Sequence, residues 1–293
     1  IDAAKVGSGL DRRVLEGGVE SSRRGPWFLD KTSRAFDYQE PTPYRPRMST
    51  DEVGDPTMGE TAEILADEFE IPREEMDEFS LRSHLRASQA TESGIFQQEI
   101  LPLPPRGKQK EAFARDETIR ADTTLEKLAR LPPVFRRNGR VTAGSSSPLT
   151  DGASGCLVGH LDALEEEGIR PQARVLGIAT VALDPRRMGM GPALAIPRLL
   201  SAMGLRLSEI DLFEINEAFA AQILAANREL QIPDDVLNVH GGAIALGHPF
   251  GATGIRLMVT LVNALREKGG RRGIASLCVG GGQGIAMIVE RAM

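Results

Sequence analysis

The chain is poor in cysteine and in long apolar runs. Its 293 residues contain only Cys156 and Cys278, too few thiols for a disulfide framework, so we expect a protein of a reducing compartment. No apolar run is long enough to span a bilayer, and no stretch has the pattern of a signal peptide. We therefore expect a soluble, cytoplasmic protein that does not insert into membranes.

An excess of positive charge is also absent. The formal net charge is −6 at pH 7, which gives no reason to expect nucleic acid as a partner. Hydrophobic residues make up 41% of the sequence, enough for one large or two modest domains with a buried core. Paired arginines are most often solvated surface, although they could form a rim that attracts a phosphorylated ligand. The pairs are Arg12-Arg13, Arg23-Arg24, Arg136-Arg137 and Arg271-Arg272.

The first ten residues resemble the end of a helix. Gly7 and Gly9 stand near its exit, and the chain does not begin with methionine. Domains usually start in loops rather than inside a helix. We therefore expect an incomplete or processed form of a longer protein.

A segment without regular layers is expected after a short strand at residues 14–18. Residues 21–39 are polar, and prolines exclude long elements at residues 40–57 and 100–110. Residues 20–147 should therefore form an insertion rich in loops and short helices.

Two helices are expected inside this insertion. Thr57-Met58-Gly59-Glu60 fits a capping box that opens a helix to about residue 68. Pro72 suits the first position of a second helix to about residue 90. Met76, Phe79 and Leu85 should share one face of that second helix.

Strands and helices alternate after Ser145-Ser146-Ser147. This alternation favours a layered α/β fold with helices on both faces of a sheet. We expect helices at residues 151–167, 192–203, 217–230 and 251–268, strands at 174–183, 211–215, 274–279 and 285–290, and an extended segment at 236–246.

His248 is the first candidate for catalysis. It lies in the sharp turn Gly247-His248-Pro249, directly before a predicted helix. Pro249 fixes the local backbone, and Gly251 allows a ligand to approach closely. A histidine in such a turn could act as a general base near neutral pH. The alternative is a histidine that only stabilises the turn.

Cys278 ends an apolar strand and precedes a glycine-rich run from Gly280 to Gly284. These glycines leave backbone N–H groups free to form an oxyanion hole. Cys278 could act as a nucleophile or as an acid and base. It could also be a buried structural thiol, and Cys156 is expected to serve only packing.

Asn216 follows a predicted strand and precedes a predicted helix. Asparagine is a good N-terminal cap, which is the simpler interpretation. The alternative is an amide that orients a water molecule or a carbonyl group.

Several segments together resemble the thiolase family, most closely its bacterial acetyl-CoA acyltransferases. The resemblance is carried by Asn216-Glu217-Ala218-Phe219, by Gly241-Gly242-Ala243, by Gly247-His248-Pro249 with Gly251, and by Cys278 with its glycines. Residues 17–21, 58–63, 122–128 and 141–144 match further thiolase segments in the expected order.

The resemblance implies a five-layer αβαβα fold made of two related halves, with the first half truncated here and with an α-rich loop domain. Residues 1–19 would be the remnant of the N-terminal half, and residues 20–147 the loop domain that binds coenzyme A. Residues 148–171 would be a helix that returns to the N-terminal half, and residues 172–293 would be the C-terminal half.

The resemblance also implies a chemistry. This is the thiolysis of a 3-oxoacyl-CoA, or the reverse Claisen condensation of two acyl-CoA molecules. His248 would activate a nucleophilic cysteine and help hold a thioester oxygen, and Cys278 would move a proton to or from the α-carbon. Asn216 would position a water in one oxyanion hole, and the amide of Gly280 would contribute to the other.

Further positions match residues that line the coenzyme A and pantetheine channel of the family. They are Ser147, Ala143, Gly144, Phe135, Met58, Ala218 and Phe219. Coenzyme A and acyl-CoA would be substrates; no permanent cofactor or metal is implied. A homodimer or homotetramer is the usual assembly of the family.

The sequence departs from the family pattern at three places. The nucleophilic cysteine of the family would lie upstream of Ile1, and no cysteine precedes Cys156. His240 stands where asparagine is common, and Ser22-Arg23 replaces the usual Met-Ser near a subunit contact.

Two functions therefore compete. The first is an acetyl-CoA acyltransferase whose N-terminal segment is missing here, so that this chain alone would be inactive. The second is a thiolase-like protein that binds acyl-CoA or a partner subunit without covalent catalysis. A plain thioester hydrolase is less consistent with the glycines after Cys278.

Overall fold

A mixed four-stranded sheet is the centre of the structure, a computed structural model that describes residues 2–29, 42–107 and 110–292. Its strand order is β3-β6-β5-β4; β4 and β5 are parallel, and the other two pairs are antiparallel. A separate sheet pairs β1 with β2. The strands are β1 (Arg13–Glu20), β2 (Gly152–Gly159), β3 (Ala173–Ala182), β4 (Leu212–Ile215), β5 (Arg272–Val279) and β6 (Gln283–Arg291).

Nine α-helices surround these strands within the described residues. They are α1 (Asp2–Gly7), α2 (Met58–Glu68), α3 (Arg73–Glu92), α4 (Leu125–Ala129), α5 (Leu161–Glu165), α6 (Gly191–Met203), α7 (Ala220–Leu230), α8 (Ala243–Leu246) and α9 (Thr253–Lys268). In the part of the chain that the structure describes, no helix has the length and apolar composition needed to cross a membrane.

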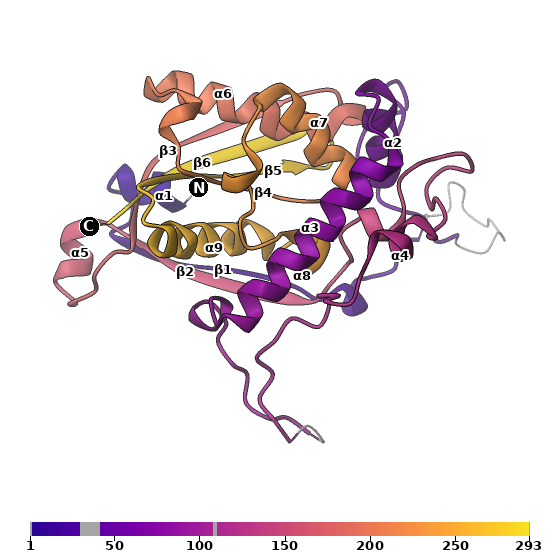
Figure 1. The fold of residues 1–293 in the computed structure, drawn as a ribbon. Helices are drawn as coiled ribbons and strands as arrows, with labels where there is room; N and C mark the ends of the chain where they lie inside the picture. Colours follow the sequence, from indigo (N-terminus) through magenta and orange to yellow (C-terminus); the bar gives the residue numbers. More distant parts are fainter. Residues whose placement is uncertain (1, 30–41, 108–109, 293) are drawn as a thin grey trace, which may run out of the picture.

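The elements stack in layers around α9 (Figure 1). Helix α6 packs on one face of the four-stranded sheet and α9 on the other, and β1 and β2 lie on the far side of α9. Ile196 and Leu199 of α6 share an apolar cluster with Ile274 and Ile288 of the sheet. The predicted α/β fold with helices on both faces is therefore confirmed, and the described residues supply four of the five expected layers.

Two glycines bring the β1–β2 sheet directly against the turn before α9. A Cβ on Gly18 would lie 2.1 Å from the Gly251 carbonyl oxygen, and a Cβ on Gly251 would lie 2.2 Å from the Val19 carbonyl oxygen. Ser154 Oγ donates to the Ala252 carbonyl at 2.6 Å. Only glycine permits this backbone contact, so β1 and β2 support the turn that contains His248.

The predicted helix at residues 151–167 is wrong over its first half. Residues Gly152–Gly159 form strand β2, antiparallel to all of β1, and only Leu161–Glu165 is helical. The segment is rich in glycine and small residues, and long-range pairing with β1 decides its conformation. Residues 148–171 are therefore not a returning helix. The C-cap of α5 is Glu166 rather than the predicted Gly168, which lies two residues further along at φ +70°.

The other C-terminal predictions are close, with two corrections. Helix α7 begins at Ala220 rather than residue 217, because Phe219 is extended and forms a bridge with Ser146. Residues 236–246 are not continuously extended, since they include helix α8. The strands and helices predicted at 174–183, 192–203 and 251–290 are confirmed to within a few residues.

The predicted helices of the insertion are also present. Thr57 and Glu60 form the predicted reciprocal capping box of α2. Pro72 is the N-cap of α3 rather than its first residue. Met76 and Phe79 are buried, but Leu85 is 50% exposed and does not share their face. Residues 30–41, within the segment predicted to be irregular, lie outside the described residues.

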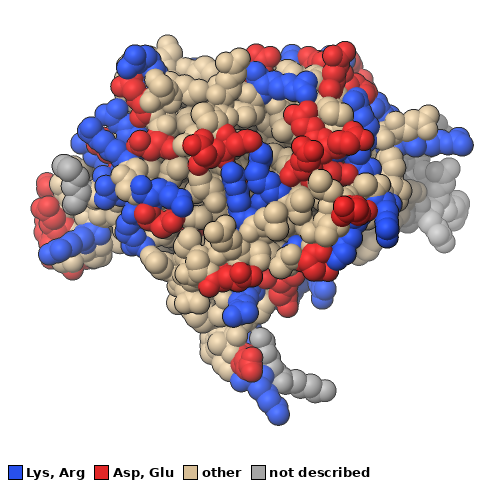
Figure 2. All heavy atoms as spheres, in the orientation of Figure 1, with Lys and Arg blue, Asp and Glu red and all other residues tan. Residues whose placement is uncertain are grey.

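An arm projects from the lower side of the molecule in Figure 1, formed by residues around the Leu103–Phe113 pair. Leu103 and Phe113 exchange two backbone hydrogen bonds of 2.9 Å. Figure 2 shows mostly uncharged atoms along the base of this arm, while positive and negative side chains are interspersed over the face drawn above it. Leu101 is 82% exposed on the arm.

The outer face of the β1–β2 sheet is apolar and exposed. Leu15 pairs with Leu157 and Val19 pairs with Ala153 on this face. Leu15 is 81% exposed and Val19 is 72% exposed. A contiguous apolar patch of this kind favours association.

We predict that the chain of residues 1–293 self-associates and that Leu15→Lys with Val19→Lys reduces this association. The lysines would place charge on the apolar face without altering the buried face of the sheet. Gel filtration with light scattering measures the effect. Leu85→Lys, an exposed leucine on α3, is the matched control and should not change the elution. A monodisperse unsubstituted monomer would contradict the prediction.

Candidate active site

His248 is held in one orientation by Thr253. The turn between α8 and α9 contains His248, with Gly247 at φ +90°. The Thr253 hydroxyl donates to the Pro249 carbonyl at 2.8 Å and lies 2.7 Å from His248 Nδ1. Because its single proton is used on Pro249, the hydroxyl accepts from Nδ1–H. His248 Nε2 is therefore left as the unprotonated, basic nitrogen.

Asn216 lies against that basic nitrogen. Its side-chain Nδ2 is 3.2 Å from His248 Nε2, in donor geometry. The Asn216 side chain is buried, and its Oδ1 has no hydrogen-bond partner among the described residues. A buried carbonyl oxygen without a partner is a position for a water molecule or a ligand donor. The proposed N-terminal cap is wrong, since Phe219 stands at the N-cap of α7.

Burial keeps the His248 imidazole neutral. Desolvation lowers the pKa of His248 to about 4, and the nearby positive charge of Arg256 acts in the same direction. The ring also contacts Phe250, with ring centroids 4.8 Å apart. A neutral imidazole whose Nε2 is unprotonated is in the form that a general base requires at neutral pH.

Cys278 lies at the same edge of the sheet as Asn216. Ile215 pairs with Ser276 in the parallel β4–β5 ladder, and the Asn216 N–H donates to the Ser276 carbonyl at 2.9 Å. Asn216 and Cys278 are thus at the carboxyl ends of neighbouring strands, where α/β folds place their reactive groups. Burial raises the pKa of Cys278 to about 12, so this thiol is protonated at neutral pH.

A glycine turn follows Cys278 and connects β5 to β6. Gly281 and Gly282 both have φ of +85°. A Cβ on Gly280 would lie 3.3 Å from Met48 Sδ and 3.4 Å from Met58 Sδ. The amide predicted for the second oxyanion hole is therefore bordered by two flexible thioethers, one of which, Met58, is a predicted channel residue.

The predicted channel residues form a connected set. Ser147 N and Oγ both lie 3.0 Å from the Ala218 carbonyl, to which they donate. The rings of Phe135 and Phe219 meet edge to face with centroids 5.7 Å apart. A Cβ on Gly59 would lie 2.0 Å from the Phe135 ring, so the start of α2, next to Met58, belongs to the same set.

Ala143 and Gly144 are held near Ser147 by a tight turn. Thr142 Oγ1 accepts from the Gly144 N–H at 3.2 Å, and the Thr142 carbonyl accepts from Ser146 Oγ at 2.6 Å. The turn is anchored by buried Glu63, whose Oε1 accepts from the Val141 N–H at 2.9 Å. Sequence reasoning did not identify Glu63, because a glutamate inside a helix is usually solvated.

Glu217 was also missed, although it stands beside Asn216. Its carboxylate is buried and accepts from Ser83 Oγ at 2.6 Å, from Asn238 Nδ2 at 2.9 Å and from the Ile244 N–H at 3.2 Å. The Glu217 side chain thus connects the segment after β4 to α3 and to residues 238–244, which precede His248. Thr253 was missed as well, although its position at the start of the predicted helix was a usable signal.

Two sequence candidates lie apart from this site. His240 Nε2 contacts Glu267 Oε2 of α9 at 2.8 Å, and its ring packs on Phe96. Cys156 lies on β2, where its thiol faces Glu16. Neither residue is joined by a described contact to His248, Asn216 or Cys278. Within the described ranges, no three His, Cys, Asp or Glu side chains gather as metal ligands.

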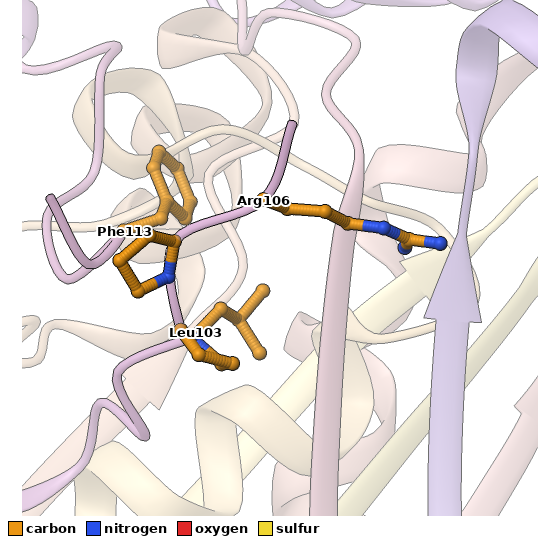
Figure 3. A pocket seen from close by; sticks show the side chains of 5 residues that line it. Leu103, Arg106 and Phe113 are labelled. Carbon is orange, nitrogen blue, oxygen red and sulfur yellow. The ribbon is translucent and has the colours of Figure 1, made fainter. Parts of the chain in front are cut away.

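A hollow of about 420 Å³ lies on the projecting arm, away from these residues (Figure 3). It is lined by Leu103, Pro104, Pro105, Arg106 and Phe113. It contains no acid–base pair and none of the predicted site residues. This hollow is therefore separate from the predicted site around His248.

The chain matches family models and proteins that are thiolases or acyltransferases. Two family models match, "Thiolase, N-terminal domain" over residues 3–161 and "Thiolase, C-terminal domain" over residues 169–291. A beta-ketoadipyl-CoA thiolase of Pseudomonas aeruginosa is 43% identical, with 95% of this chain and 72% of that protein covered. A probable acetyl-CoA acyltransferase of Staphylococcus epidermidis is 41% identical, with coverage of 97% and 73%.

Solved structures agree with these matches. Human mitochondrial 3-ketoacyl-CoA thiolase superimposes with a TM-score of 0.92 at 38% identity, covering 99% of this chain and 74% of that one. The same human enzyme in complex with CoA gives a TM-score of 0.91 at 37% identity, with coverage of 99% and 73%. The chain thus spans about three quarters of these relatives. By sequence and by fold, it belongs to the thiolase family.

Proposed function

We propose that the protein is a thiolase-type acyltransferase that cleaves a 3-oxoacyl-CoA into acetyl-CoA and a shortened acyl-CoA, or runs the reverse Claisen condensation. The observation that carries this proposal is the His248–Asn216 pair. Thr253 leaves His248 Nε2 basic, and the unpartnered Asn216 Oδ1 faces a position for water. A thiolase needs such a base beside a site for oxygen charge.

This scheme needs a nucleophilic cysteine in addition to His248 and Cys278, so we assign the full activity to a form of the protein that carries such a cysteine. His248 Nε2 takes the proton of the nucleophilic thiol, and the thiolate adds to the 3-oxo carbon. The C2–C3 bond then breaks and its electron pair goes to C2. The protonated thiol of Cys278 delivers a proton to C2, and acetyl-CoA leaves.

The second half of the cycle restores each group. The thiolate of Cys278 takes the proton of an incoming CoA thiol, whose sulfur attacks the acyl-enzyme thioester. The nucleophilic cysteine leaves as a thiolate and recovers its proton from His248. The water held by Asn216 and the amide of Gly280 stabilise the oxygen charges that develop in these steps.

Coenzyme A is the expected binding partner of the channel. Ser147, Ala218, Phe219 and Phe135 form a connected wall beside the Ala143–Gly144 turn, which suits a narrow pantetheine arm. A permanent cofactor has no role in this chemistry. We also propose that the protein shortens acyl chains in the cytoplasm, as in fatty acid β-oxidation.

A homodimer or homotetramer is the proposed assembly. The apolar outer face of the β1–β2 sheet and Leu101 on the arm are exposed. Exposed apolar surface of this extent is what an oligomer interface or a further part of the same polypeptide would cover.

A second candidate is a catalytically incomplete thiolase-like protein that binds acyl-CoA or a partner subunit. It would follow if no form of the protein carries a covalent nucleophile, because the acyl-enzyme route would then be lost. The intact His248–Asn216 contact favours the acyltransferase.

We predict that His248→Ala, in a form that carries the nucleophilic cysteine, lowers kcat for thiolysis by roughly 10²–10⁴-fold, the usual contribution of a general base. The assay is the loss of absorbance of the 3-oxoacyl-CoA–magnesium complex. His160→Ala, at an exposed histidine before α5, is the matched control and should retain the wild-type rate. Unchanged turnover in His248→Ala would exclude the assigned role.

We also predict that the chain binds CoA and that Ala143→Trp weakens this binding at least tenfold. Ala143 is exposed, so the indole should obstruct the channel without disturbing the core. Isothermal titration with CoA measures the change, and Ala202→Trp, at an exposed alanine of α6, is the control. Equal affinity of the two variants would remove the channel assignment.

A further inference from the structure

A second contact between β4 and α9 lies behind the His248–Asn216 pair. Glu214 stands two residues before Asn216, and Arg256 stands three residues after Thr253. Arg256 Nη1 lies 3.5 Å from Glu214 Oε2. The side chains are 20% and 2% exposed, respectively. The contact therefore joins the two elements that carry Asn216 and the threonine that orients His248.

Glu214 has an unusual environment for a carboxyl group. Burial raises the pKa of Glu214 to about 8, against the attraction of Arg256. The pKa of Glu214 is also raised by the charges of Glu217 and Glu99 and lowered by that of Arg86. At neutral pH, Glu214 therefore mainly contacts Arg256 as a protonated carboxyl that accepts a charge-assisted hydrogen bond.

Arg256 also faces the loop domain. Its charge acts on Glu99 and on the exposed Asp116. Glu99 in turn accepts from Thr260 Oγ1 of α9 at 2.8 Å. Arg256 of α9 therefore contacts Glu214 of β4, and its charge also acts on Glu99 and Asp116.

Three atoms of this cluster are buried without a hydrogen-bond partner among the described residues. They are Glu99 Oε1, Glu214 Oε1 and Arg256 Nη2. A buried polar cluster with unsatisfied hydrogen-bonding atoms contributes little to the stability of the fold. Apolar side chains of similar size would stabilise the fold more. Its placement behind the site indicates a different role.

We propose that Glu214 and Arg256 are positioning residues that fix β4 against the first turn of α9 and thereby set the contact between Asn216 and His248. Arg256 has a second effect, because its positive charge disfavours a protonated imidazole. This inference rests on the proposed roles of His248 and Asn216, and its test does not use activity alone.

The test is an NMR titration of the His248 ring, together with the side-chain amide signals of Asn216, in the chain of residues 1–293. Arg256→Met removes a cation near the imidazole, so the pKa of His248 should rise from about 4 toward the ordinary 6.5. The Asn216 amide signals should shift with it, because the contact loosens.

Arg73→Met is the matched control. Arg73 forms a similarly buried pair with Asp77 within α3, with side chains 19% and 5% exposed. This variant should lower the melting temperature but leave the His248 and Asn216 signals in place. If Arg256→Met changes these signals no more than Arg73→Met does, the proposal is wrong.

Glu214 provides a second test that does not depend on Arg256→Met folding. Glu214→Gln keeps an acceptor oxygen of the same reach and should preserve the Asn216 signals. Glu214→Leu removes the acceptor and should shift them. Equal spectra for the two variants would overturn the proposal.

A kinetic test separates this proposal from the proposed function. In a form that carries the nucleophilic cysteine, Glu214→Leu should lower kcat at an unchanged KM for CoA. Failure of the proposed function would instead appear as unchanged turnover in His248→Ala.

Discussion

The site depends on one buried carboxylate, that of Glu217. It accepts hydrogen bonds from Ser83 of α3, from Asn238 and from the Ile244 amide, so that α3 and the segment of residues 238–244 converge on it. A buried carboxylate must be fully hydrogen-bonded to be tolerated. These donors therefore fix the segment that leads to His248 relative to the end of β4, where Asn216 lies next to Glu217.

The surrounding structure makes His248 a base by two separate means. Thr253 holds the proton on Nδ1 and leaves Nε2 toward Asn216, while burial and Arg256 keep the ring neutral. The β1–β2 sheet supports the same turn through the Gly18–Gly251 contact. Cys278, on the neighbouring strand, is kept protonated by burial. An unprotonated imidazole nitrogen and a protonated thiol are thus found near the carboxyl ends of β4 and β5.

Local patterns in the sequence predicted most of the C-terminal half and the helices of the insertion. Reciprocal capping by Thr57 and Glu60 and the glycine that ends α6 are local interactions, and both are present. The helix predicted at residues 152–159 was wrong, because small residues have no strong secondary-structure preference and pairing with β1 decides their conformation. The sequence left Asn216 as either a helix N-cap or an amide that orients a water molecule or a carbonyl group. The structure excludes the N-cap, because α7 begins only at Ala220.

The sequence by itself identified His248, Cys278 and Asn216 as the catalytic candidates, because each follows glycine or strand signals within a few residues. Only the tertiary structure decided their protonation and their hydrogen-bond partners. The tautomer of His248, the protonation of Cys278 and the unpartnered oxygen of Asn216 depend on burial and on contacts with residues distant in sequence. Desolvation and long-range hydrogen bonds exist only in the folded chain, and no local pattern encodes them.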